Sequence, residues 1–115
     1  MNEYIFESID YKNDPEWVVK YYFNSMHLQG KFIFMLPYLL NKVGCCVNEA
    51  YCSFPDFEDP DPECYFEGMM FGVWGGEVIV SESVGFNYAR LACEKYLQLY
   101  PEDTEKVNTL LVQLP

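Results

Sequence analysis

The pair Gly75-Gly76, which separates two apolar runs, is the feature that most constrains how this chain can fold. The run before it spans residues 65–74, and the run after it spans residues 77–81. Glycine adopts positive φ without a steric cost, and two such residues between apolar runs are typical of a tight β-hairpin. The pair therefore predicts two antiparallel strands, 65–74 and 77–81.

A third strand is predicted before this hairpin. Side chains alternate between two sides from Cys45 to Phe54, which is the pattern of a half-buried strand. Within the run 65–74, Gly68 and Gly72 indicate a bulge or a close backbone approach. The middle of the chain is therefore expected to form a small antiparallel sheet.

Two helices are predicted before the strands. Asp14 suits the N-cap and Pro15 suits the first helical position, so the first helix is expected to run from there through Met26. The second helix is expected over residues 31–41, where Pro37 must either kink it or split it into two short pieces.

Two more helices are predicted after the strands. Ser83 is the expected N-cap of a long helix that ends at Tyr100, because apolar residues recur there at helical spacing. Pro101 stops this helix and begins the last one, with acids in its first turn. The expected buried stripe of the last helix consists of Val107, Leu110, Leu111 and Leu114.

The predicted order is helix, helix, three strands, helix, helix. Grouped strands and helices, rather than strict alternation, favour an α+β fold. We expect a three-stranded antiparallel meander packed with about four helices, in the order ααβββαα. The chain has 115 residues, which is the size of one typical domain, so residues 1–115 are expected to form a single domain.

The composition limits the classes of partner. The chain has 18 acidic and 7 basic residues, a formal net charge of −11 that opposes direct binding to nucleic acid. No apolar run is long enough for a membrane span, and the acidic start lacks the features of a secretory signal, so we expect a cytoplasmic protein without a membrane partner. Five cysteines without a Cys-x-x-Cys pair are expected to be free, mostly buried thiols.

The strongest local signal is the segment 55–63, which joins the first two predicted strands. Five of its nine residues are acids, and between Lys42 and Arg90 there are nine acids and no Lys or Arg. Three interpretations remain open. A calcium site is disfavoured because the EF-hand spacing and its mid-loop glycine are missing. A solvated connector needs no function, and a docking surface would steer and pair with a basic protein.

Catalysis has little support in the residue types present. The single histidine, His27, lies near the end of the first predicted helix, which favours a surface or helix-capping role. Cys93 is interpreted as a core residue, and no local nucleophile signature, phosphate loop or dinucleotide motif is present. The cysteines and the histidine lack zinc-site spacing. We therefore expect no catalytic residue, metal or cofactor.

Several sequence blocks, taken together and in this order, resemble one bacterial family. They are Phe23-Asn24-Ser25-Met26, Gln29-Gly30-Lys31-Phe32, Tyr51-Cys52-Ser53-Phe54-Pro55-Asp56, Tyr65-Phe66-Glu67-Gly68, Val78-Ile79-Val80-Ser81, Leu91-Ala92-Cys93-Glu94-Lys95-Tyr96-Leu97 and Pro101-Glu102-Asp103. The family comprises the ribonuclease-toxin immunity proteins of contact-dependent growth inhibition (CDI) systems, the CdiI type.

The resemblance implies a small cytoplasmic protein that binds the C-terminal nuclease domain of a toxin one to one and blocks its RNA-binding cleft. It also implies an EndoU-like or RNase A-like toxin, with tRNA as a candidate substrate, and no catalytic residue in the inhibitor. The chemistry is compatible, because an RNase presents a basic cleft that an acidic surface can occupy.

The expected contact surface lies in and just after the acidic segment. Its carboxylates are expected to pair with cations of the toxin, while aromatic side chains act as buried anchors, because exposed ion pairs contribute only about 0–1 kcal/mol each. Phe57 and Tyr65 are the expected anchors, and Trp74 is a further candidate if its side chain faces outward. The expected partner-binding residues are Asp56, Phe57, Glu58, Asp59, Asp61, Glu63, Tyr65 and Glu67.

The same acidic surface also fits a protein of another class, an acidic adaptor or nucleic-acid mimic that regulates a different nuclease or a DNA-binding protein. The two interpretations differ in genomic setting, because an immunity gene is expected directly downstream of a large secreted-toxin gene. Neither interpretation indicates an oligomeric state.

Overall fold

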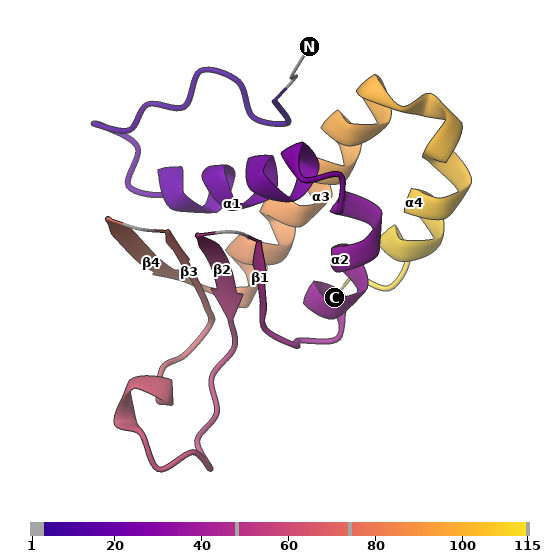
Figure 1. Ribbon diagram of the computed structural model, residues 1–115. Coiled ribbons are helices and arrows are strands. Elements are labelled where there is room, and N and C mark those ends of the chain that lie inside the picture. The colour runs from indigo at the N-terminus through magenta and orange to yellow at the C-terminus, as the bar shows by residue number, and fades with distance from the viewer. Residues whose placement is uncertain (1–3, 48, 74, 115) are drawn as a thin grey trace.

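The sheet is built from four antiparallel strands within the part of the chain that is described. The computed structural model describes residues 4–47, 49–73 and 75–114. The strands are β1 (Cys45–Val47), β2 (Ala50–Ser53), β3 (Met69–Val73) and β4 (Gly76–Val80). They lie side by side in chain order, and each pairs antiparallel with its neighbour, as in a meander (Figure 1).

The described residues also form four α-helices and two short 3-10 turns. The helices are α1 (Trp17–Leu28), α2 (Phe32–Leu40), α3 (Glu82–Leu99) and α4 (Thr104–Leu111), and the turns are η1 (Pro62–Cys64) and η2 (Pro101–Asp103). In Figure 1 the helices gather above and to the right of the sheet. The predicted α+β class is confirmed, as is the meander with helices before and after it.

The first predicted strand is two strands in the structure. β1 and β2 pair with each other, with Val47 opposite Ala50, so the segment 45–54 folds back on itself. The described sheet therefore has four strands where three were expected. The polar pair Asn48-Glu49 in the middle of the apolar alternation was the available signal, because asparagine and charged residues are depleted in strands.

The predicted hairpin is confirmed as β3 and β4. Gly75 lies in the turn with φ +94°, a conformation that favours glycine. Gly76, which was predicted to belong to the turn, is instead the first residue of β4 and lies opposite Val73. The first strand of this hairpin is shorter than predicted, because β3 begins at Met69 and residues 65–68 belong to the preceding loop.

Gly68 makes the predicted close backbone approach, whereas Gly72 lies against a side chain. A Cβ atom at Gly68 would meet the carbonyl oxygen of Val80, and Gly68 also has positive φ. A Cβ atom at Gly72 would meet the ring of Tyr51 from the neighbouring strand β2. Each glycine therefore makes room for a specific neighbour.

Helix α1 begins at Trp17, so Asp14 is not its N-cap and Pro15 is not its first residue. The Asp14 carboxylate instead accepts the backbone N–H of Glu16 at 2.9 Å and pairs with Lys20 at 2.6 Å. Asp14 thus closes a turn just before the helix. Aspartate stabilises such turns and helix N-caps by the same side-chain-to-backbone bond, so the sequence did not separate the two.

Helix α3 is capped by Ser81 rather than by the predicted Ser83. The Ser81 hydroxyl accepts the backbone N–H of Val84 at 3.1 Å, whereas Ser83 lies within the first turn. The cap follows directly after Val80, the last residue of β4, so the end of the strand fixes the start of the helix.

The remaining two helices agree with the predictions except at their starts. Pro37 lies inside α2 without splitting it. The segment Pro101–Asp103 forms a 3-10 turn, so α4 itself begins at Thr104. Val107 is fully buried, and the three leucines of the predicted stripe are half-buried. None of the described helices combines the length and apolarity needed to cross a membrane.

One face of the sheet carries the core. Helix α1 lies on this face, where the rings of Tyr22 and Phe23 pack on Phe71 with centroids 5.4 and 6.1 Å away. Helix α3 reaches the same face, because the sulfur of Met69 fills the space beside Gly85. Met69 and Phe71 are fully buried as a result.

A buried asparagine joins the segment before α1 to the core. The Asn24 side chain accepts the backbone N–H of Phe6 at 2.8 Å and donates to the Phe6 carbonyl at 3.0 Å. Ile5 and Phe6 are both buried. The chain just before α1 is therefore part of the packed structure.

Candidate partner-binding surface

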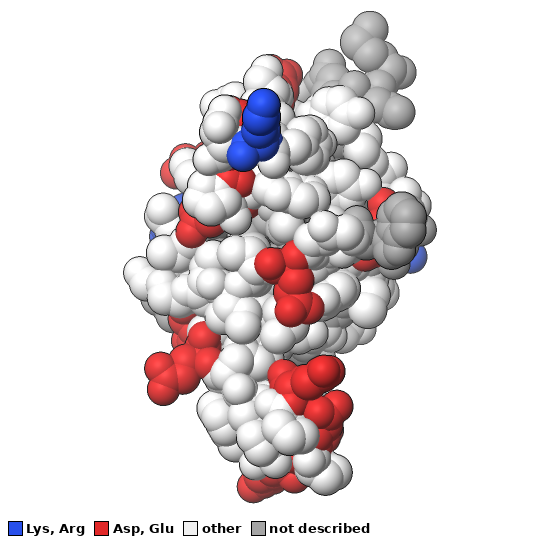
Figure 2. Space-filling model, turned by 90° about the vertical axis from the view of Figure 1, so that its left-hand side faces the viewer, with Lys and Arg blue, Asp and Glu red and all other residues white. Residues whose placement is uncertain are grey.

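The connection between β2 and β3, residues 54–68, projects from the sheet, and we call it the acidic loop. In Figure 1 it extends below the sheet, away from the helices. The loop contains six acids and no Lys or Arg, and all eight predicted binding residues lie in it. Five of the six acids are exposed, and Asp59 is half-buried. On the face shown in Figure 2, the projection carries acidic side chains and no basic one.

Three aspartates give the acidic loop its shape. One carboxylate oxygen of each accepts the backbone N–H two residues further along: Asp56 from Glu58 at 3.1 Å, Asp59 from Asp61 at 2.8 Å and Asp61 from Glu63 at 3.0 Å. The base of the loop is closed by the Asp56 N–H, which donates to the carbonyl of Cys64 at 2.9 Å. Each carboxylate keeps further lone pairs for a partner.

The two predicted anchors lie against each other on the loop. The rings of Phe57 and Tyr65 stack with centroids 5.9 Å apart and planes 22° apart. They remain 63% and 43% exposed, respectively, although both are large and apolar. The Tyr65 hydroxyl donates to the backbone carbonyl of Asp59, which fixes the ring beside the acids. The structure thus places an exposed aromatic pair among the carboxylates.

The field of the loop carboxylates acts on Cys64. Burial raises the pKa of the Cys64 thiol above its ordinary value, and the negative charges of Asp59, Asp61, Asp56 and Glu63 raise it further. Each carboxylate disfavours a second negative charge at this point. The same field favours a cation brought by a partner.

One predicted binding residue lies apart from this arrangement. Glu67 is exposed, but it lies just before β3 and outside the three aspartate turns. Trp74, the further candidate anchor, lies outside the described residues. The loop therefore brings together Phe57, Tyr65 and the five acids of the segment 55–63.

The side chains considered for catalysis lie in the interior. His27 is buried rather than on the surface, because Tyr96 and Tyr100 pack against its ring and its Nε2 lies 3.0 Å from the Tyr100 hydroxyl. Burial raises the pKa of Cys93 to about 12, so this thiol stays protonated at neutral pH and is a core residue as predicted. Among the described side chains, no group of three or more His, Cys, Asp and Glu is arranged to hold a metal ion.

Two of the cysteines whose burial is described, Cys52 and Cys93, are buried as predicted. Cys46, Cys64 and Cys93 form no disulfide. Cys93 is buried, Cys64 is half-buried and Cys46 is exposed at the sheet edge. The prediction of mostly buried thiols is therefore wrong for Cys46.

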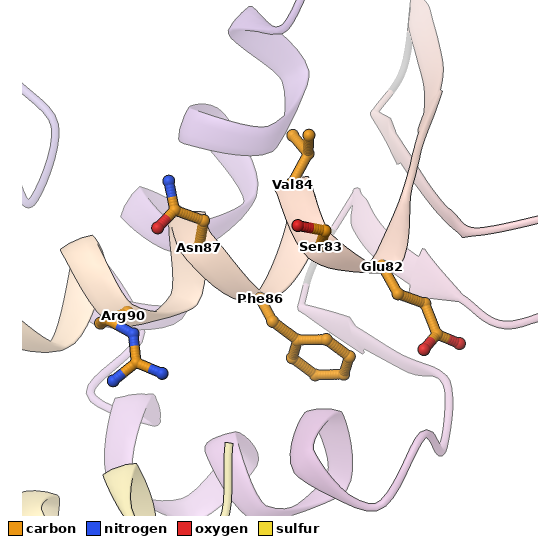
Figure 3. A pocket seen from close by; sticks show the side chains of 6 residues that line it. All are labelled: Glu82, Ser83, Val84, Phe86, Asn87 and Arg90. Atoms are coloured by element: carbon orange, nitrogen blue, oxygen red, sulfur yellow. The ribbon is translucent and has the colours of Figure 1, made fainter. Parts of the chain in front are cut away.

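A hollow on the first turns of α3 was not identified from the sequence (Figure 3). It has a volume of about 540 Å³ and is lined by Glu82, Ser83, Val84, Phe86, Asn87 and Arg90. The Phe86 ring stacks on Phe54, the first residue of the acidic loop, with centroids 6.5 Å apart. Because Glu82 and Arg90 carry opposite charges, the hollow lacks the single-sign field of the loop. Its only sequence signal was Arg90, the first base after nine acids.

Comparison with known proteins links this structure to one family. Residues 15–111 match the model of a family described as CDI immunity protein. The match begins just before α1, ends at the last residue of α4 and contains the whole acidic loop. A search of curated proteins found no match.

Proposed function

Because the chain belongs to the CDI immunity protein family, we propose that it neutralises its cognate toxin by binding that toxin's C-terminal ribonuclease domain. Family membership supplies an immunity function directed against a CDI toxin. The proposal adds that the toxin is an EndoU-like or RNase A-like RNase with tRNA as a candidate substrate. It also adds that the complex is one to one and forms in the cytoplasm.

The observation that carries the proposal is the projecting loop with six acids and no base. A ribonuclease holds its substrate in a cleft with positive potential, because it must attract phosphates. A negative projection enters such a cleft with a favourable field and excludes RNA from it. We therefore assign occlusion of the RNA-binding cleft to the acidic loop.

Charge alone does not account for tight binding. Exposed ion pairs contribute only about 0–1 kcal/mol each, whereas aromatic side chains that become buried at the centre of an interface often contribute about 2 kcal/mol or more. Phe57 and Tyr65 already form a stacked pair beside the carboxylates. The pair therefore needs little ordering on binding, which lowers the entropic cost of association.

The proposal is tested with the nuclease domain encoded immediately upstream of this gene. Calorimetry measures binding and stoichiometry, and RNA cleavage is followed in parallel. The informative variant is Asp59→Asn/Asp61→Asn, because asparagine keeps the side-chain oxygen that accepts the loop N–H groups but removes two charges. We expect affinity to fall by about tenfold or more, with a loss of protection against RNA cleavage.

The matched control is Glu102→Gln/Glu105→Gln, which removes two exposed carboxylates near the start of α4. This control is expected to bind and protect as the wild type does. If both double variants lower the affinity equally, the effect comes from net charge alone, and the loop is rejected as the contact site. If the wild type does not bind the upstream nuclease, the ribonuclease assignment fails and the acidic-adaptor alternative gains support.

A further inference from the structure

The second face of the sheet is not covered by the helices. The core-facing row Cys52, Phe71 and Val78 alternates with two rows that point the other way. These outer rows are Tyr51, Gly72 and Glu77, and next to them Ser53, Met70 and Ile79. Ile79 is 47% exposed, which is high for a residue in a strand. We call these six residues the outer sheet face.

One outer row is arranged as a small polar platform. Tyr51 and Glu77 lie on either side of Gly72, and the Tyr51 ring rests over the glycine, where no side chain displaces it. The Tyr51 hydroxyl reaches across and donates to a carboxylate oxygen of Glu77. This bond raises the pKa of Tyr51 to about 12, so the phenol stays neutral and remains a donor. An aromatic ring and an exposed carboxylate are thereby held together.

The three strands that carry this platform contain no Lys or Arg. Glu77 is the only charged residue of the outer sheet face, and no Lys or Arg occurs between Lys42 and Arg90. Strands β2 and β3, which supply Tyr51 and Gly72, also run directly into the two ends of the acidic loop. The outer sheet face therefore adjoins the base of the acidic loop, where a basic partner that binds the loop can also contact it.

We propose that the Tyr51–Gly72–Glu77 row receives an arginine side chain of the toxin domain that the acidic loop engages. This inference rests on the proposed function and extends its contact surface onto the sheet. A guanidinium group can stack its plane on an aromatic ring while it donates to a carboxylate, whereas a lysine ammonium group lacks the planar fork. Ile79 and Met70 in the adjacent row provide an apolar border that limits competition from water.

Two variants test the two parts of this site separately. Glu77→Gln keeps the size of the side chain and its oxygen acceptor but removes the charge, and we expect the toxin domain to bind about tenfold more weakly. Tyr51→Leu removes the ring, and we expect a loss of about fivefold. Tyr51→Phe keeps the ring but loses the hydroxyl that holds Glu77, so its affinity is expected to lie between those of the wild type and Tyr51→Leu. Glu94→Gln, an exposed carboxylate on α3, is the charge-matched control.

A double-mutant cycle identifies the arginine. Each toxin arginine is replaced by lysine, and its effect is measured with wild-type protein and with Glu77→Gln. One arginine should lose most of its effect in the Glu77→Gln background. If Glu77→Gln and Tyr51→Leu both bind as the wild type does, or if no arginine is coupled to Glu77, the arginine site is rejected while the loop assignment stands. If the wild type does not bind at all, both proposals fail.

Discussion

Gly68 and Gly75 both have positive φ, yet their surroundings differ. A Cβ atom at Gly68 would collide with the backbone carbonyl of Val80. A Cβ atom at Gly75 would meet no atom of the described residues within 4 Å, apart from its chain neighbours. Positive φ alone costs a non-glycine residue about 1–2 kcal/mol. A clash with the backbone adds to this cost, because a carbonyl in a paired strand cannot rotate away as a flexible side chain can.

The contrast predicts the stability of two alanine variants. Gly75→Ala is expected to lower the free energy of unfolding by about 1–2 kcal/mol, from positive φ alone. Gly68→Ala is expected to lower it by more than about 3 kcal/mol, because β3 and β4 must also separate locally. Urea denaturation of both variants measures the difference. Equal losses would contradict the close approach at Gly68.

The roles of some residues could be predicted from the sequence, and those of others could not. The contact of Gly68 with the Val80 backbone was foreseen, because a glycine inside an apolar run usually marks a bulge or a close backbone approach. The Tyr51 ring beside Gly72 was not foreseen. The burial of His27 was not foreseen, because its partner Tyr100 lies 73 positions away and no local pattern links the two. The surroundings of His27 are set by tertiary packing, which a local sequence pattern does not reveal.

At the scale of elements, the sequence predicted which helices form and that β3 and β4 form a hairpin, but not the residues at which the helices start. All four helices and the β3–β4 hairpin were identified from periodicity and glycine. The helix starts were missed because Asp14, Ser81 and Ser83 all have the side-chain chemistry of a cap. The split of residues 45–54 into β1 and β2 was missed because apolar alternation continues on both sides of the polar pair.

The two serines at the start of α3 provide a direct test. Ser81→Ala is expected to lower the free energy of unfolding by about 1 kcal/mol, because the Val84 N–H loses its side-chain acceptor. Ser83→Ala is expected to change it by less than about 0.5 kcal/mol, since Ser83 is exposed within the first turn. Thermal or chemical denaturation distinguishes them. A larger effect at Ser83 would restore the cap position favoured by the sequence alone.

At the scale of the whole molecule, charge is distributed unevenly. The net charge of −11 includes a continuous stretch of the chain with nine acids and no base, and that stretch forms the sheet, the acidic loop and the start of α3. The density of acidic residues in the sequence was enough to identify the loop as the candidate partner-binding surface. The outer sheet face was not selected, because Tyr51 and Glu77 lie 26 positions apart and meet only through the strand register.

This charge distribution predicts how salt affects association with the toxin domain. The association rate constant is expected to fall by about tenfold or more as ionic strength rises from about 0.01 M to about 0.15 M, because the Debye length shrinks from about 30 Å to about 8 Å. The dissociation rate constant is expected to change by less than about threefold. Stopped-flow measurements at several salt concentrations separate the two. An association rate independent of salt would rule out electrostatic steering.

The residues of the acidic loop differ in how well they tolerate substitution. Asp56, Asp59 and Asp61 hold the backbone through their side-chain oxygens, so their replacement alters the shape of the loop unless an oxygen acceptor remains. Glu58 and Glu63 supply only backbone N–H groups to those turns, so their side chains can vary without that cost. A lineage that meets a new toxin can therefore retune its recognition at the glutamates while the aspartates preserve the scaffold that displays them.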